Sequence, residues 1–91
     1  IRVADFDEAV AVANDTPFGL SAGICTRSLS ASSRFRQDCE AGMIMVNLPT
    51  AGVDYHVPFG GTKASSYGAR EQGAYAAEFY TKVKTTYILA G

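Results

Sequence analysis

Histidine and cysteine are scarce in this sequence. The chain has one histidine, His56, and two cysteines, Cys25 and Cys39, which are too few ligands for a four-coordinate zinc site. Two thiols still permit a disulfide or a metal pair. However, Cys25 lies in an apolar run and Cys39 on a helical pattern, which favours two small, buried, reduced side chains in the cytoplasm. We therefore expect no bound metal.

Long apolar runs and an excess of one charge are also missing. No stretch approaches the roughly 18 apolar residues of a membrane span, and no basic start followed by an apolar segment predicts a signal peptide. Eight Lys and Arg against nine Asp and Glu give a net charge of −1, and the basic residues are scattered. We therefore expect neither a membrane nor a nucleic acid as a partner.

The chain is short. Its 91 residues are enough for one small domain, which would bury only about two-thirds of its extended-chain surface and be marginal alone. The first residue is Ile1 rather than Met. We interpret this as the sign of a processed chain or a fragment.

Two helices are predicted in the first half of the chain. Asp5 and Glu8 form a capping-box pattern for a helix that ends at Asn14. A second helix is predicted from Ser28 to Glu40, with Ser28 or Ser30 as its cap. Its inner side is marked by Leu29, Ser32, Phe35, Arg36 and Cys39.

Two short apolar runs flank the second helix, Leu20–Thr26 and Met43–Asn47. The second run shows no alternation, which predicts a strand covered on both faces. A strand, a helix and a strand joined by short links form a βαβ unit. The sequence therefore predicts an α/β fold.

Glycine and proline gather between Val57 and Gly73, where they supply five of seventeen residues. Such a loop brings backbone close to a ligand, and Gly60 and Gly61 are expected to form a tight turn. A helix from Arg70 to Tyr80 and a strand from Val83 to Leu89 are predicted to follow.

Three blocks resemble the C-terminal region of the aldehyde dehydrogenase superfamily. They run from Ala11 to Gly23, from Met43 to Gly73 and from Glu78 to Thr85. The middle block contains an apolar run ending at Asn47, a variable loop from Leu48 to Val57, and then Pro-Phe-Gly-Gly. That tetrapeptide alone occurs by chance in turns, but three blocks in the right order are specific and span nearly the whole chain.

The middle block departs from the commonest family pattern, Lys-x-Ser-Gly-x-Gly-Arg-Glu. Ser66 stands in place of the glycine, and Ala69 is an additional residue before Arg70. Together with Asp54-Tyr55-His56, this wording resembles the dehydrogenases of 2-oxoglutarate semialdehyde (2,5-dioxopentanoate). A substrate carboxylate needs an Arg or hydroxyl donors, and the matching Arg is expected upstream of this segment.

The resemblance implies the C-terminal part of an NAD(P)-dependent aldehyde dehydrogenase. Residues 1–81 would complete the catalytic domain, and residues 82–91 would form an oligomerisation strand. In this family a cysteine thiolate attacks the aldehyde, a hydride passes to NAD or NADP, and water releases the acid. Neither Cys25 nor Cys39 stands in the nucleophile context, and no G-x-G-x-x-G follows a strand. We therefore expect no catalytic residue, no bound cofactor and no turnover from the segment alone.

The resemblance also supplies substrate-binding candidates. Phe59 matches the aromatic residue that lines the aldehyde tunnel in the family, with a core plug beside the turn as the alternative. The variable loop adds Thr50, Tyr55 and His56, with Asp54 as a further polar residue. Loops carry such roles because the scaffold positions them, although a solvated loop without contacts is the alternative for each.

Structural roles are expected for several neighbouring residues. Asn47 is predicted to orient the loop after it by bonding backbone groups. Lys63 is interpreted as a solvated charge, and Glu71 as an acidic residue at a helix N-terminus. Tyr75 and Phe79 are predicted to pack as i,i+4 partners in a core or interface.

Two other hypotheses remain open at this level. The chain would be a stand-alone domain that homodimerises through Val83–Leu89, or a small module whose loop grips an anion with Lys63 and Arg70. In the favoured hypothesis, the partners are a small aldehyde substrate and further copies of the chain bound through the terminal strand.

Overall fold

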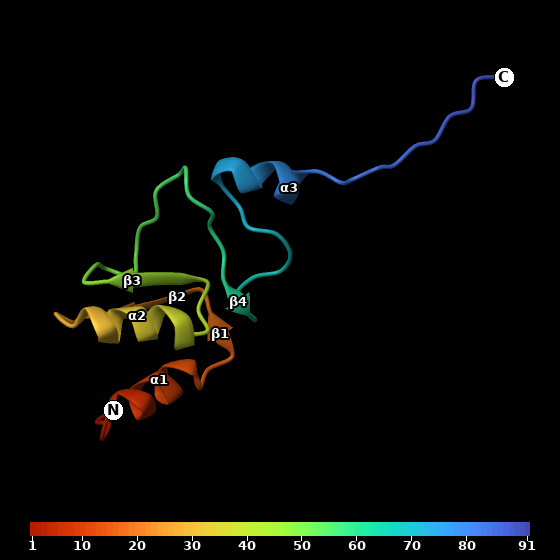
Figure 1. Ribbon diagram of the computed structural model, residues 1–91. Coiled ribbons are helices and arrows are strands. Elements are labelled where there is room, and N and C mark those ends of the chain that lie inside the picture. The colour runs from red at the N-terminus through yellow and green to blue at the C-terminus, as the bar shows by residue number, and fades with distance from the viewer.

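The computed structural model describes residues 1–91 as a small α/β body followed by an extended C-terminal end (Figure 1). The elements follow in the order α1, β1, β2, α2, β3, β4, η1, α3. The predicted α/β class is therefore confirmed. No helix is long and apolar enough to cross a membrane.

Helix α1, Phe6–Asn14, begins where the capping pattern predicts. Asp5 Oδ1 accepts a hydrogen bond from the Glu8 N–H at 2.9 Å, and Glu8 Oε2 accepts one from the Ala4 N–H at 2.6 Å. The second arm of the capping box thus ends one residue earlier than in the standard motif. Val10 is the buried side chain of this helix.

Helix α2, Leu29–Asp38, is capped by Ser28, whose hydroxyl accepts from the N–H three residues on at 3.2 Å. Ser32 and Phe35 are buried, as predicted. The guanidinium of Arg34 lies 4.8 Å from the centre of the Phe6 ring and joins this helix to α1. A cation over an aromatic ring is attracted to its face.

Three side chains predicted to be covered are exposed instead. They are Cys25, Leu29 and Arg36, and Leu29 is 83% exposed. Spacing shows which side of a helix or strand is apolar, but not which chain covers it. No other part of this chain covers these three positions.

Strands β2, Ser21–Ile24, and β3, Met43–Val46, pair in parallel over their whole length, and α2 connects them. The predicted βαβ unit is confirmed. A second, antiparallel pair joins β1, Phe18–Gly19, to β4, Thr62–Lys63. The sequence predicts that β3 is buried on both faces. All four of its residues are only half-buried, so this chain alone does not cover both faces of the strand.

The third helix begins later than predicted. A 3₁₀ turn, η1, spans Gly73–Tyr75 and leads into α3, Ala76–Tyr80. Arg70 and Glu71 lie outside both elements, because Glu71 exchanges two backbone hydrogen bonds with a residue of the preceding loop. Gln72, with φ at 69°, then turns the chain away from a helical path. The role of Glu71 at a helix N-terminus is therefore wrong.

The predicted strand Val83–Leu89 is not formed within this chain. Residues 82–91 belong to no helix or strand and are fully exposed, and they run away from the body (Figure 1). A strand needs a neighbour for its backbone groups, and no other segment lies beside this one. Tyr75 and Phe79 are also exposed, and the Phe79 ring meets Tyr80 edge-on at 4.8 Å.

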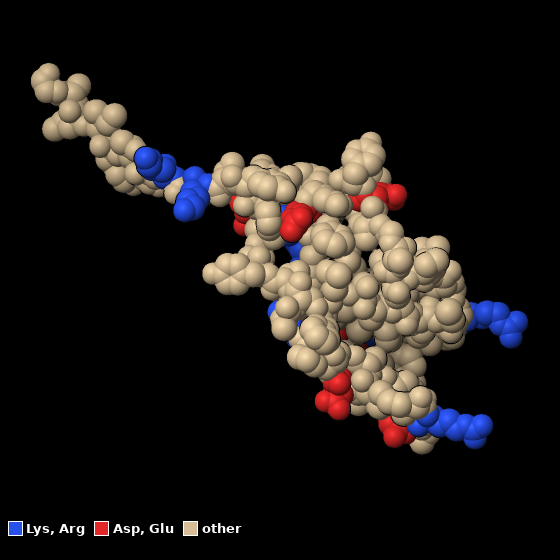
Figure 2. Space-filling view, turned by 180° about the vertical axis from the view of Figure 1, so that it is seen from behind, with Lys and Arg blue, Asp and Glu red and all other residues tan.

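The chain has too little core for its size. Only 6 of 91 residues are buried, and the accessible surface is 7291 Å², against about 5,100 Å² for a compact protein of this mass. The radius of gyration is 18.1 Å, against about 12 Å for a compact domain of this length. On the face in Figure 2 the charged groups are scattered and much of the surface is uncharged. The chain therefore leaves much apolar surface uncovered.

Candidate functional site

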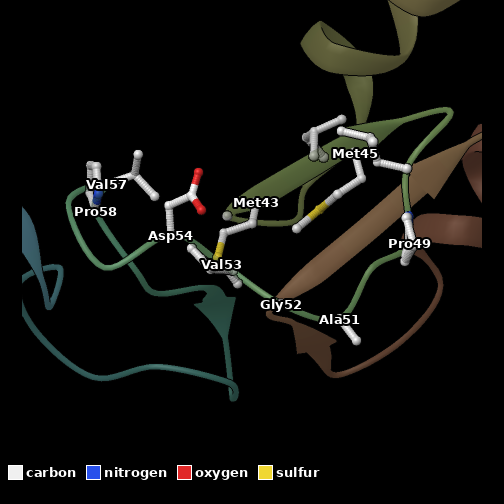
Figure 3. Close-up of a pocket in the computed structure, with 12 residues that line it drawn as sticks. Met43, Met45, Pro49, Ala51, Gly52, Val53, Asp54, Val57 and Pro58 are labelled. Atoms are coloured by element: carbon white, nitrogen blue, oxygen red, sulfur yellow. The ribbon is translucent and has the colours of Figure 1, made fainter.

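The largest hollow lies between β3 and the loop that follows it. Its volume is about 440 Å³, within the range of small-ligand pockets. Figure 3 shows Met43 and Met45 of the strand and Val53 and Asp54 of the loop around it. Twelve residues line it, seven of them hydrophobic: Gly42, Met43, Ile44, Met45, Leu48, Pro49, Ala51, Gly52, Val53, Asp54, Val57 and Pro58.

Asp54 is the only charged residue of this lining. Its carboxylate makes no hydrogen bond or ion pair within the chain, while its backbone carbonyl accepts from the Val57 N–H at 3.3 Å. The cavity is therefore mostly apolar with one free carboxylate at its edge. The loop carries two valines, Val53 and Val57, and both line the cavity, so apolar residues within this loop are the sequence signal for its lining.

The four predicted substrate-binding residues do not line this cavity. Thr50, Tyr55 and His56 are exposed on the loop, and the Tyr55 and His56 rings meet edge-on at 5.4 Å. Phe59 is half-buried and pairs with Glu71 through backbone hydrogen bonds of 2.7 and 2.8 Å. The structure therefore does not bring the four together within this chain, and their contact with substrate stays a prediction.

The glycines after Phe59 permit a close approach of three backbone segments. Gly60 and Gly61 are buried. A Cβ on Gly61 would lie 2.7 Å from the Gly19 carbonyl oxygen, and a Cβ on Gly42 would lie 2.6 Å from the Gly61 Cα. No side chain fits at such distances. The tight turn expected here is thus a junction between strands, and one of its members, Gly42, also lines the cavity.

Asn47 ties together the ends of β2 and β3. Its side-chain oxygen accepts from the Thr26 N–H at 2.8 Å, and its amide donates to the Thr26 carbonyl at 2.8 Å. Its φ is 57°, a left-handed conformation that asparagine tolerates better than most residues. The predicted structural role of Asn47 through backbone bonds is confirmed, but the backbone groups that it binds belong to Thr26 rather than to the loop after it.

Lys63 is an exposed residue, as the sequence predicts, but its ammonium is engaged within the chain rather than free. Its ammonium donates to the carbonyl oxygens of Asn14 at 2.6 Å and Thr16 at 3.2 Å, and it pairs with Glu40 at 2.5 Å. These partners lie 23 or more positions from it in sequence, so no local pattern shows them. The ammonium of Lys63 is bound by groups of the chain itself, so it does not support the hypothesis of an anion-binding module.

One titratable group is clearly perturbed, and it lies away from the cavity. The hydrogen bond and charge of Asp7, 2.6 Å from Arg34, raise the pKa of the Arg34 guanidinium above its usual value. Asp38 adds a weaker contribution at 3.8 Å. This ion pair fastens α1 to α2 and has no place in the site's chemistry. No group of three or more His, Cys, Asp or Glu is placed to hold a metal ion.

Comparison with known proteins identifies the family. The model of the aldehyde dehydrogenase family matches residues 1–86 of the chain. The chain belongs to the aldehyde dehydrogenase family. The family resemblance carried by the three sequence blocks is therefore confirmed.

Two curated relatives act on semialdehydes, as their names state. The chain is 51% identical to the alpha-ketoglutarate semialdehyde dehydrogenase of Haloferax volcanii over 88 residues, which cover 96% of this chain and 18% of that protein. It is 42% identical to the alpha-ketoglutaric semialdehyde dehydrogenase of Bacillus subtilis over 88 residues, 97% of this chain and 18% of that protein. The similarity to the 2-oxoglutarate semialdehyde subgroup is confirmed.

The fold of this aldehyde dehydrogenase segment also matches a solved structure. The salicylaldehyde dehydrogenase of Pseudomonas putida G7, complexed with salicylaldehyde, superposes with a TM-score of 0.84 at 33% identity. The match covers 92% of this chain and 17% of that chain. The segment thus spans less than a fifth of the length of these relatives, which agrees with its large exposed surface.

The dinucleotide cofactor that the family implies does not fit the residues of this segment. A pyrophosphate group binds at a helix N-terminus behind an open glycine-rich turn. Here the first turn of α1 carries Asp7 and Glu8, which repel phosphate. The first turn of α2 has no acidic residue, but no glycine-rich turn leads into this helix. The glycine-rich turn is closed, because a Cβ on Gly60 would lie 2.8 Å from Cδ of Arg70. We derive no cofactor step from these residues.

Proposed function

We propose that this chain is the C-terminal part of a cytoplasmic NAD(P)-dependent aldehyde dehydrogenase that oxidises a semialdehyde, such as 2-oxoglutarate semialdehyde, to the carboxylic acid. The observation that carries the proposal is the 51% identity with an alpha-ketoglutarate semialdehyde dehydrogenase across 96% of the chain. The nucleophile, base and cofactor site would lie in the remaining four-fifths of the enzyme.

In this proposal the segment forms one wall of the substrate entrance. β3 and the loop from Leu48 to Val57 provide the apolar side of the cavity, as ligand pockets require. Phe59, Thr50, Tyr55 and His56 are the proposed substrate contacts once the rest of the enzyme covers the loop. The free carboxylate of Asp54 repels a carboxylate on the substrate. The substrate carboxylate would therefore point away from this wall, toward a cation elsewhere in the enzyme.

Residues 82–91 are proposed to pair with another copy of the enzyme. They are exposed along their whole length, and an unpaired extended segment with β-branched and aromatic residues invites pairing with another chain. Residues 1–81 would then belong to the catalytic domain and residues 82–91 to the oligomer contact. A homo-oligomer would thereby cover surface that this chain leaves bare.

The test is steady-state kinetics of the full-length enzyme. Reduction of NAD and NADP is followed with 2-oxoglutarate semialdehyde, with succinate semialdehyde as a shorter carboxylate substrate, and with salicylaldehyde as an aromatic one. We expect the highest kcat/KM with 2-oxoglutarate semialdehyde. Equal or better turnover of aldehydes without a carboxylate would overturn the substrate class, and no reduction with any aldehyde would overturn the activity.

A further inference from the structure

The backbone N–H and the backbone carbonyl of Gly61 are both bound by side chains of the loop that follows it. The Gly61 N–H donates to the Ser66 hydroxyl oxygen at 2.7 Å. The Gly61 carbonyl accepts a hydrogen bond from Nη1 of Arg70. Gly61 is itself buried, so its N–H and carbonyl cannot reach water and need these partners within the protein.

Arg70 lies in the glycine junction rather than in the cavity. A Cβ on Gly60 would lie 2.8 Å from its Cδ, and a Cβ on Gly42 would lie 2.9 Å from its Nη2. The side chain therefore occupies space that only glycines leave open. Arg70 is half-buried and no carboxylate pairs with it, so its contact with the Gly61 carbonyl is not a by-product of an ion pair.

The same loop also fixes the backbone of Phe59. Its N–H donates to the Glu71 carbonyl at 2.7 Å, and its carbonyl accepts from the Glu71 N–H at 2.8 Å. Residues 66–71 thus hold the chain at Phe59 and again at Gly61, on either side of Gly60. With both neighbours of Gly60 fixed, the backbone sets the direction in which the Cα–Cβ bond of Phe59 leaves the chain.

We propose that Ser66 and Arg70 are positioning residues that act on the substrate through Phe59. By holding the N–H and the carbonyl of Gly61, they would keep the backbone after Phe59 on the course from which its ring meets the aldehyde chain. This inference rests on the proposed function, in which Phe59 contacts the substrate. A small displacement of a contact group has a large effect on binding, because apolar discrimination depends on close fit.

The matched experiment compares Ser66→Ala with Ser65→Ala in the full-length enzyme. Like Ser66, Ser65 accepts a hydrogen bond from a glycine N–H through its hydroxyl, at 2.9 Å. The glycine that it binds is Gly19 and not Gly61. We expect Ser66→Ala to raise KM for the long semialdehyde about fivefold, with kcat little changed, as for one lost hydrogen bond. Ser65→Ala should keep the wild-type KM, and Ser66→Thr should restore most of it.

Arg70 is tested by Arg70→Ala and Arg70→Lys, each alone and combined with Phe59→Ala. If Arg70 acts through Phe59, Arg70→Ala changes the ratio of kcat/KM between short and long aldehydes about tenfold in the wild-type background and not in the Phe59→Ala background. Arg70→Lys should recover part of the change. A ratio that changes equally in both backgrounds, or not at all, would overturn the role proposed for Arg70.

A second measurement separates this inference from the proposed function. With 4-fluorophenylalanine at position 59, fluorine NMR should show one sharp resonance in the parent enzyme and a shifted or divided one in Ser66→Ala. An enzyme that oxidises no aldehyde but shows this change would refute the function and keep the positioning role. An unchanged resonance in Ser66→Ala and Arg70→Ala would refute the positioning role, whatever the activity.

Discussion

The ammonium of Lys63 donates a 2.6 Å hydrogen bond to the backbone carbonyl of Asn14, 49 positions earlier in the chain. Asn14 is the last residue of α1, where carbonyl groups lack partners within the helix and a cation is favourable. The same ammonium pairs with Glu40 just after α2. One side chain on β4 therefore joins the ends of both helices.

Replacement of Lys63 by methionine should destabilise the enzyme without changing its substrate preference. Lys63→Met keeps much of the stem but removes the contacts to Asn14, Thr16 and Glu40, which are together worth about 1–2 kcal/mol after allowance for solvent. We expect a lower melting temperature in calorimetry. Arg36→Met, at an exposed cation without an ion pair, is the control and should shift it little. A melting temperature as high as the parent's would contradict the role given to Lys63.

Asn47 offers a test that separates hydrogen bonding from backbone strain. Asn47→Gly loses the two side-chain bonds to Thr26 but tolerates the positive φ, whereas Asn47→Ala loses the bonds and is strained as well. We expect both to lower stability, and Ala to cost about 1 kcal/mol more than Gly. Thermal inactivation half-lives measure the order. Equal half-lives for the two variants would show that the conformation at this residue relaxes.

Local signals were sufficient for the two helices and the parallel strand pair in the first half of the chain. Asp5 and Ser28 act on N–H groups three residues away, so their capping roles are visible as short sequence patterns. The apolar run at Met43 likewise predicted β3 and its parallel pairing with β2. The family resemblance rested on three such blocks. In each case the cause of the structure and its sequence signal lie within a few residues of each other.

The remaining errors come from partners that are distant or absent. Glu71 follows a helix-like pattern, but its backbone groups pair with Phe59, twelve positions earlier. In sequence Lys63 is an ordinary surface lysine, because its partners lie in two distant segments, at residues 14–16 and at Glu40. Leu29 and the end of the chain carry correct apolar patterns, but no surface within the chain covers them. The valines of the loop, Val53 and Val57, hint at the cavity in sequence, but its shape depends on how the loop folds over Met43 and Met45, which no local pattern shows.

Phe59→Ala in the full-length enzyme should alter aldehyde preference more than stability. Phe59 is only half-buried within this segment, so its removal leaves a smaller cavity than the loss of a core residue would. The loss of apolar contact should change kcat/KM for long relative to short aldehydes by about 10-fold or more. Kinetics with both substrates and a melting curve decide the matter. A large fall in melting temperature with an unchanged preference would place Phe59 in the core.

The 91-residue chain alone should not oxidise aldehydes. Cys25 is exposed but has no cationic or basic partner in hydrogen-bond reach, and a thiol needs such a neighbour to become a nucleophile. The assay is reduction of NAD or NADP with an aldehyde panel that includes 2-oxoglutarate semialdehyde. Turnover that disappears in Cys25→Ala or Cys39→Ala would contradict this expectation, because the segment would then hold its own nucleophile.

The terminal segment should pair with another chain. In an extended strand, one side would carry Val83, Thr85, Tyr87 and Leu89, and the other Lys84, Thr86 and Ile88. Residues 82–91 are exposed throughout and extend away from the rest of the chain. The whole chain, with this segment included, is 72 Å long. Pairing within the same chain is the alternative, since termini do dock on their own sheets. The molecular mass in solution of the full-length enzyme, compared with that of a form ending at Thr81, distinguishes the two. A truncated form of unchanged oligomeric mass would refute the interface.

Two proline variants then test whether the contact is a backbone ladder. Neighbouring N–H groups of a strand point to opposite edges, so a strand added at the edge of a sheet uses the N–H of Thr85 or of Thr86, but not both. Proline removes one such donor. We therefore expect one of Thr85→Pro and Thr86→Pro to lower the oligomeric mass at micromolar concentration, while the other keeps it. Two variants that both retain the parent mass would exclude strand pairing. Two that both dissociate would indicate a segment bonded on both edges, buried inside a sheet shared between copies.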